Sequence, residues 1–276
     1  MLMREVNLKN VEFKDKLDRL SKQIQNQVID DETVWKKCLQ FDLDRQDPYK
    51  RKKTGYPQHE WYKHSPHWDI LPDDCIDIKD KMDPTSLDYL KYMMNEMSNN
   101  KDSNATSGFP NKEIFFTLVG LEQRMGIDYA KNIRSLVTDI SYKFLGGSSV
   151  ALAAFYPPGG YIPWHHNGNA PGWNVLLHYS LGGNGSFYTW HDGQVIEYKD
   201  KAGDWVCRAG RFLDTVGQKR EHDARGLRMG GEDTPHVGVN EASWHCARTF
   251  DWRFTLSTIT NSEEIWLDII DELETE

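Results

Sequence analysis

The chain has 276 residues and a formal net charge of −9, from 33 Lys and Arg against 42 Asp and Glu. A chain of this length can bury a sizeable core in one large domain. The acidic balance disfavours a general nucleic-acid binder, although it does not exclude a local basic groove. No apolar window approaches the roughly 18 residues of a membrane span. The 4 cysteines form no CxxC pair, which disfavours a zinc ribbon and indicates reduced thiols in a soluble, cytoplasmic protein.

The first part of the chain, residues 1–105, is charged and is predicted to be a helical or irregular extension that packs on the core. Apolar residues recur at helical spacing over residues 11–29, which predicts an amphipathic helix. Asp30 or Asp31 can cap the helix that follows. Residues 86–97 predict a further helix.

Strands are predicted to dominate the second part, residues 106–276, in which residues 114–119 form the first strand and residues 128–136 a helix. Alternating apolar residues bounded by turn signals are typical of half-buried strands. The other predicted strands cover residues 150–156, 161–166, 173–181, 186–190, 195–198, 204–209, 242–246 and 252–260.

Turn signals between these strands predict the fold class. Asp192-Gly193 is a strong two-residue hairpin signal between two alternating segments. Eight short strands with such spacing predict a mainly β protein with α-helices, whose core is a cupin-like jelly-roll, or double-stranded β-helix. A closing helix is expected over residues 263–273. Residues 210–240 interrupt the strands, and a loop of that length is usually functional or disordered.

Three side chains form a candidate metal site: His165, Asn167 and His245. Iron(II) that activates O₂ needs few protein ligands and several open positions. His165 and Asn167 are two residues apart, so they point to one side if the segment is extended. His245 would come from a distant strand. Any one of these histidines alone is more often an ordinary residue, but the set with the arginine considered next favours a metal site.

Arg253 follows the distal histidine by eight residues, across an expected hairpin that turns at residues 249–251. Its planar guanidinium can bind a carboxylate bidentately. Thr255 lies on the same face and could add a hydroxyl. Asn174 and His178, four residues apart on another predicted strand, share a face, and either could point towards a cosubstrate or simply pack in the core.

One segment of the chain resembles a known family. Tyr156-x-x-Gly159-Gly160 followed by His165-x-Asn167 is similar to the strand segment of prolyl 4-hydroxylase-type iron(II)/2-oxoglutarate oxygenases. In that family a Tyr precedes the metal His at this separation, a Gly pair lies between them, and His-x-Asp follows.

The resemblance covers about residues 149–260 and implies both cofactors and roles. It implies that His165 and His245 bind iron(II), that Arg253 binds the 2-oxoglutarate carboxylate, and that Tyr156 hydrogen-bonds this cosubstrate. The implied reaction is hydroxylation of an unactivated C–H bond by O₂, with ascorbate as a helper. A peptide or protein side chain is the implied substrate, by analogy of fold.

A second resemblance concerns residues 164–174 and 244–249, which are similar to uncharacterised oxygenase-like proteins of marine bacteriophages. It implies a location in the host cytoplasm. We expect the substrate to contact residues 210–240 and 56–68, the latter within a predicted long loop over residues 46–69.

Asn167 departs from the family pattern, because an amide is a weaker iron ligand than a carboxylate. Three arrangements are open: coordination through the amide oxygen, a place beside the metal with water in the third position, or a shifted register in which His166-x-Gly168 is the motif. The shifted register resembles aspartyl/asparaginyl β-hydroxylases, which use two histidines and no carboxylate. An empty third position also admits halide. The competing interpretations are a non-catalytic cupin-like binding protein and a metal-dependent isomerase or dioxygenase, although Arg253 argues against the latter.

Overall fold

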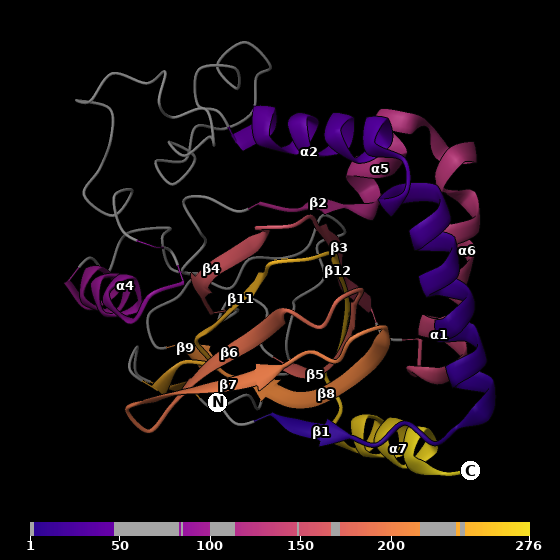
Figure 1. Cartoon of the computed structure of the whole chain (residues 1–276). Coiled ribbons are helices and arrows are strands. Elements are labelled where there is room, and N and C mark those ends of the chain that lie inside the picture. Colours follow the sequence, from indigo (N-terminus) through magenta and orange to yellow (C-terminus); the bar gives the residue numbers. More distant parts are fainter. Residues whose placement is uncertain are drawn as a thin grey trace.

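The computed structural model describes residues 3–46, 83, 85–99, 114–147, 149–166, 172–215, 236–237 and 241–276 (Figure 1). The predicted loop beyond residue 46, including the expected substrate contacts at residues 56–68, lies outside the described residues. The same holds for most of residues 210–240.

Strands that are far apart in the sequence pair in nested order. Among the eight strands of the barrel, the first, β3, pairs with the last, β12. Inside this pair, β4 pairs with β11, β5 with β8 and β6 with β7. The chain therefore runs as one long antiparallel hairpin wound into a barrel, which is a double-stranded β-helix. This confirms the predicted jelly-roll core. The strands are β3 (Ser149–Tyr156), β4 (Tyr161–His165), β5 (Gly172–Ser180), β6 (Gly185–His191), β7 (Gln194–Lys199), β8 (Asp204–Phe212), β11 (His245–Thr249) and β12 (Arg253–Thr260).

Two sheets form the walls of this barrel. The larger has the order β1-β8-β5-β12-β3-β2 and the smaller the order β4-β11-β6-β7. β1 (Arg4–Val6) and β2 (Phe116–Thr117) extend the larger sheet at its two edges. The innermost turn of the winding is the predicted hairpin, in which Asp192 and Gly193 have φ of 47° and 80°, as the tight turns that match strand twist require.

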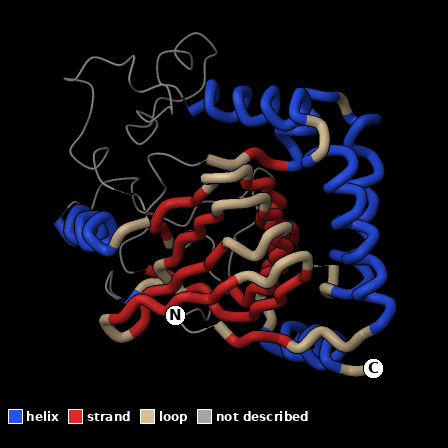
Figure 2. Tube along the Cα trace, viewed as in Figure 1, coloured by secondary structure: helices blue, strands red, loops and turns tan. Residues whose placement is uncertain are grey.

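Residues of the larger sheet alternate between a helix-covered outer face and an inner face. Phe155, Leu177 and Phe254 point outward into the main core beneath α1 (Val11–Ile24) and α6 (Ile127–Phe144). Figure 2 shows these two helices along one side of the strands. The outer face therefore carries most of the apolar burial, and polar side chains have room on the inner face.

The smaller sheet has its own apolar cover, α4 (Leu87–Asn99). Leu90 and Met93 of this helix belong to one buried cluster with Trp164 and Trp244. The indole Nε1 of Trp164 donates to the carbonyl of Thr85 at 3.0 Å. Trp164 is thus a core residue outside the barrel and does not wall its interior.

The sequence prediction was wrong for residues 114–119. Only Phe116–Thr117 is strand there, and α5 (Leu118–Met125) starts at once because the Thr117 hydroxyl caps it by accepting from the Gly120 amide at 3.0 Å. The strand predicted at residues 242–246 begins at His245 instead.

The other helices follow the sequence closely. The predicted helix at residues 11–29 ends in a π-helical turn, η1 (Gln25–Ile29). The Asp31 carboxylate accepts from the Thr33 and Val34 amides at the start of α2 (Glu32–Gln46), as expected of a cap. The chain closes with α7 (Glu263–Glu274).

Two short strands lie within the interrupting segment, β9 (Asp214–Thr215) and β10 (His236–Val237), and they pair in parallel. Among the described residues, no helix is long and apolar enough to cross a membrane. The three described cysteines, Cys38, Cys207 and Cys246, are buried.

Candidate functional site

His165 and His245 face each other across the pair β4–β11. They are register partners, and their ring centroids lie 4.1 Å apart. Strand alternation alone would turn His165 outward, because Ile162, three residues earlier, already points inward. Between Ile162 and His165, however, β4 carries one residue more than the facing stretch of β11. This β-bulge reverses the alternation and brings the His165 ring to the ring of His245.

The same local contact orients both rings. His165 Nδ1 lies 2.7 Å from the carbonyl oxygen of Pro163, and His245 Nδ1 lies 2.7 Å from that of Ser243. A carbonyl only accepts, so each Nδ1 carries the proton and each Nε2 carries the lone pair. This tautomer, with the second nitrogen held by a backbone carbonyl, is the one that metal-binding histidines adopt.

Burial keeps both rings neutral. It lowers the pKa of His165 to about 4, and it lowers the pKa of His245 well below the ordinary 6.5, with the neighbouring His165 as a further cause. Phe212 stacks on the His245 ring at 4.6 Å. The two imidazoles are therefore neutral near pH 7 and lie in an apolar setting, so each can offer the lone pair of its Nε2.

His166, the alternative ligand, lies differently from His165. Its ring packs edge-on against Trp244, with centroids 4.7 Å apart, and is fully buried. The third candidate ligand, Asn167, lies outside the described residues. Within the parts of the chain that the structure describes, no group of three or more His, Cys, Asp or Glu side chains could hold a metal, so these parts offer a two-histidine site.

Arg253 lies deeper on the inner face, at the start of β12, and is 2% exposed. Its Nε donates to Asp200 Oδ2 at 2.6 Å and its Nη1 to the Thr255 hydroxyl at 2.9 Å. Its buried Nη2 has no partner among the described residues. Two of the three nitrogens thus have a partner, and Nη2 is the nitrogen without one among the described residues.

The expected hairpin between the distal histidine and Arg253 was wrong. β11 pairs with β4 and β6, whereas β12 pairs with β3 and β5. Residues 250–252 therefore cross from the smaller sheet to the larger one. His245 and Arg253 reach the barrel interior from opposite walls, which suits a ligand lying between them.

Two further predicted residues, Tyr156 and Asn174, lie in different parts of the barrel. Tyr156 is the register partner of Arg253, whose Cζ lies 5.6 Å from the tyrosine ring centroid. Asn174 is on the inner face of β5, four residues before His178, and its amide donates to the Gly172 carbonyl at 3.1 Å. The structure thus places Tyr156 beside Arg253, and it places Asn174 towards the opposite end of β12.

Thr255 and His178 together leave one proton without an acceptor. The Thr255 oxygen accepts from Arg253, and it lies 3.2 Å from His178 Nδ1. If the hydroxyl donates to Nδ1, the proton of the neutral ring is on Nε2, which has no partner among the described residues. If Nδ1 donates instead, the hydroxyl proton is the one left over. Either arrangement places an extra donor close to Arg253.

Sequence reasoning missed two residues of this cluster, Asp200 and Arg208. Arg208 is fully buried on the inner face of β8, and its Nη1 lies 3.3 Å from Asp200 Oδ1. Asp200 therefore bridges Arg208 and Arg253. The signal was Arg208 itself, a charged residue among the apolar residues of a predicted strand. Gly185 makes room for the bridge, since a Cβ there would lie 2.5 Å from Asp200 Oδ2.

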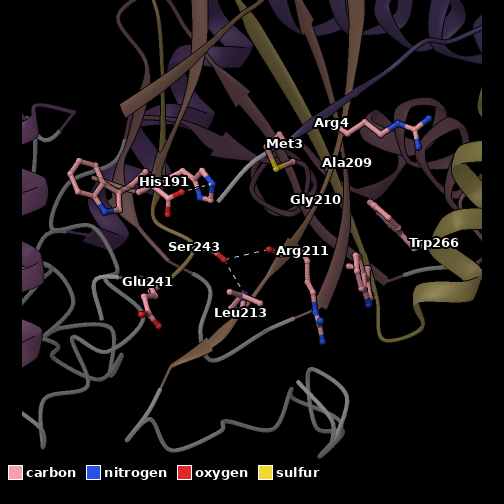
Figure 3. A pocket seen from close by; sticks show the side chains of 14 residues that line it. Met3, Arg4, His191, Ala209, Gly210, Arg211, Leu213, Glu241, Ser243 and Trp266 are labelled. Atoms are coloured by element: carbon pink, nitrogen blue, oxygen red, sulfur yellow. Dashed lines mark hydrogen bonds and ion pairs between the residues drawn. The ribbon is translucent and has the colours of Figure 1, made fainter. Parts of the chain in front are cut away.

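A pocket of about 800 Å³ is lined in part by Glu241, Ala242 and Ser243, the residues that precede β11 (Figure 3). Its walls include Trp173, Arg211 and Ser243, and the Ser243 carbonyl is the one that holds His245. Figure 3 shows Ser243 near the centre, with its dashed contacts to Leu213 and Arg211. The pocket is large enough for a side chain or a small metabolite.

Comparisons with known proteins add little to this geometry. No model of a protein family matches the chain, and no curated protein does. Solved structures that it is similar to include peruvianin-I, a cysteine peptidase from Thevetia peruviana latex, with TM-score 0.23 and 12% identity over 40% of this chain and 50% of that chain. For a predicted oxalate decarboxylase from Thermotoga maritima the TM-score is 0.22, with 17% identity over 44% of this chain and 74% of that chain. For a Pseudomonas putida prolyl-4-hydroxylase the TM-score is 0.27, with 11% identity over 62% of this chain and 83% of that chain. Such low TM-scores carry no argument, and the fold assignment rests on the nested strand pairs.

Proposed function

We propose that the protein is an iron(II)- and 2-oxoglutarate-dependent oxygenase that hydroxylates an unactivated C–H bond. The observation that carries the proposal is the pairing of two features inside one barrel. Two neutral imidazoles with Nδ1 on backbone carbonyls lie at one level, and Arg253 presents a buried, unpartnered Nη2 deeper in. A 2-oxo dicarboxylic acid matches both features, with its 2-oxo acid end at the metal and its distal carboxylate at Arg253.

The histidine pair fits iron(II). The Nδ1 contacts leave Nε2 of His165 and His245 as the nitrogens that carry lone pairs, and two imidazoles are two of the three protein ligands that such iron(II) sites use, the third being a carboxylate. Asn167 and water are the proposed further ligands. When bound, iron(II) supplies the positions for O₂ and the 2-oxo acid, and the overall reaction converts 2-oxoglutarate, O₂ and R–H into succinate, CO₂ and R–OH.

The arginine cluster binds and orients the cosubstrate in this proposal. Arg253 Nη2 donates to the distal carboxylate, and Thr255 or His178 gives the second hydrogen bond. Tyr156 flanks the arginine, and Asn174 is proposed to contact the cosubstrate nearer the histidines. The apolar side chains around the histidine pair, such as Phe212, exclude water from the reacting atoms.

The proposed substrate is a peptide or protein side chain, and the sequence resemblance at residues 156–167 supports this choice. The pocket beside Ser243 is the proposed binding place, because it adjoins the strand that carries His245.

The test is succinate formation from 2-oxoglutarate by the purified protein with iron(II), ascorbate and O₂. Slow turnover without substrate is expected, together with its loss in His245→Ala at an unchanged circular dichroism spectrum. Equal succinate formation by the wild type and His245→Ala would refute the proposed site.

One observation favours a second candidate, a non-catalytic cupin-like binding protein. Asp200 already pairs with Arg253, so an internal carboxylate meets part of the guanidinium. In that case the purified protein would form no succinate from 2-oxoglutarate. Calorimetric titrations with iron(II) and with 2-oxoglutarate would then show which of the two it binds, and binding of both without succinate formation would indicate a binding protein for the oxo acid.

A further inference from the structure

The inner face of the barrel carries more positive than negative charge. Among the buried side chains that the structure describes, Arg208 and Arg253 are the cations and Asp200 is the only carboxylate. One carboxylate neutralises one guanidinium, so a net charge of +1 remains. An uncompensated charge in a buried site is strongly unfavourable. The cluster therefore calls for one more anion.

Arg208 and Arg253 converge although they lie on different strands. Arg208 is on β8 and Arg253 on β12, with β5 between them. Each guanidinium contacts one oxygen of Asp200, and each lies beside a tyrosine ring, Tyr198 at 5.7 Å or Tyr156 at 5.6 Å. Asp200 thus holds the two heads side by side.

Each arginine keeps one nitrogen without a partner among the described residues. In Arg208 the Nη2 donates to the Lys199 carbonyl at 2.6 Å, Nη1 contacts Asp200, and Nε is buried and unpartnered. In Arg253 the unpartnered nitrogen is Nη2. Burial first, and then the charges of both arginines, hold the pKa of His178 well below its usual range, so both charges act on the His178 side chain.

We propose that Arg208 is a second carboxylate-recognition residue and that Asp200 is the positioning residue that holds both arginines for one shared carboxylate. This inference rests on the proposed function, because that carboxylate is the distal one of the 2-oxo acid. The ligand class is a dicarboxylate whose far end meets two guanidiniums. A 2-oxo acid without the second carboxylate leaves the +1 charge uncompensated.

The test compares two ligands that differ only in this group, 2-oxoglutarate and 2-oxopentanoate. Their dissociation constants are measured by calorimetry on the full chain with iron(II) and without O₂, and again without metal. The ratio of the two constants reports recognition of the distal carboxylate. Damage to the fold or to the metal site would weaken both ligands and leave the ratio unchanged.

The variants are Arg208→Met, Arg208→Lys and Arg253→Met, with Arg248→Met as the matched control. Arg248 lies on β11 and contacts Asp83 and Phe250, away from the cluster. We expect the preference for 2-oxoglutarate to fall at least about tenfold in Arg208→Met and Arg253→Met, since hydrogen bonds to charged groups are the strong ones. Arg208→Lys should retain part of it, and Arg248→Met all of it.

The outcomes separate this inference from the proposed function. Loss of the preference in Arg253→Met but not in Arg208→Met would overturn the role of Arg208 and leave the oxygenase proposal intact. No preference in the wild type would overturn both. An equal fall in the Arg248→Met control would also overturn the inference, because the preference for 2-oxoglutarate would then not depend specifically on the two arginines of the cluster.

Discussion

The two ends of the barrel interior satisfy their polar groups in different ways. At the histidine end each ring is held by a carbonyl two residues earlier in the same chain segment. At the arginine end the contacts join β8, β12 and the residue after β7, and they leave donors unpartnered among the described residues. The first end is complete in itself, whereas the second is complete only with a further anion.

This difference shows how a barrel can prepare a site at two levels. A neutral, locally oriented pair of imidazoles costs little to bury, since each ring has its hydrogen bond. A charged cluster is expensive to bury, so its retention in the interior points to a use. Four experiments test the comparison.

The largest effect is expected from replacing His165, with a replacement of the adjacent His166 as the control. His165→Ala should reduce iron(II) affinity by more than about 100-fold, since even groups that only orient a metal ligand contribute 10–100-fold. His166→Gln should keep the affinity, because that ring packs against Trp244. The metal content after dialysis against iron(II) measures both. The reverse result would assign the shifted register with His166 as the ligand.

Removing the bridging carboxylate tests the arginine end. Asp200→Asn leaves two buried guanidiniums facing a neutral amide, so the free energy of unfolding should fall by about 3–5 kcal/mol. The matched control is Asp83→Asn, whose ion pair with Arg248 is half exposed and should contribute about 1 kcal/mol or less. Urea denaturation measures both. Equal losses in the two variants would show that the buried bridge contributes no more to the free energy of unfolding than the half-exposed ion pair does.

Acid should act through the buried histidines. Burial lowers the pKa of His165 to about 4, and burial with the neighbouring His165 lowers that of His166 to about 3. The folded state then binds protons more weakly than the unfolded state, whose pKa is near 6.5. Stability is therefore full above pH 6.5 and falls as the pH drops from 6.5 towards 4.

The slope of this loss is limited to about 1.4 kcal/mol per pH unit for each histidine. Urea denaturation of the metal-free protein between pH 7 and pH 4 measures it. His166→Gln removes one titrating ring and should make the slope shallower. Stability that stays constant over this range would show that the rings are solvated.

The smallest effect is expected at Thr255. Thr255→Val keeps the shape but removes the oxygen that contacts Arg253 and His178. One hydrogen bond contributes about 0.5–1.5 kcal/mol, so the dissociation constant of 2-oxoglutarate should rise about threefold to tenfold. The iron(II) affinity is the internal control and should not change. A variant that binds 2-oxoglutarate as the wild type does would exclude the hydroxyl from the carboxylate site.

The strands that carry the two histidines were predictable from the sequence because the signals that mark a strand are local. Turn residues such as Asp192-Gly193 and the alternation of apolar residues located most of the strands, and their number and spacing indicated the jelly-roll class. His165, His245 and Arg253 were identified by residue type and spacing. Their roles as ligands and as a carboxylate clamp stay predictions, and Asn167 lies outside the described residues.

Other features were decided only by the tertiary structure. The bulge in β4 turns His165 inward, and it is visible only in the register with β11. The connection after β11 crosses between the sheets, which no local signal distinguishes from a hairpin. Asp200 and Arg208 meet Arg253 because three separate segments converge on one side of the barrel. Periodicity and turn chemistry are short-range properties of a chain, whereas a buried charge acquires its partners from residues distant in sequence.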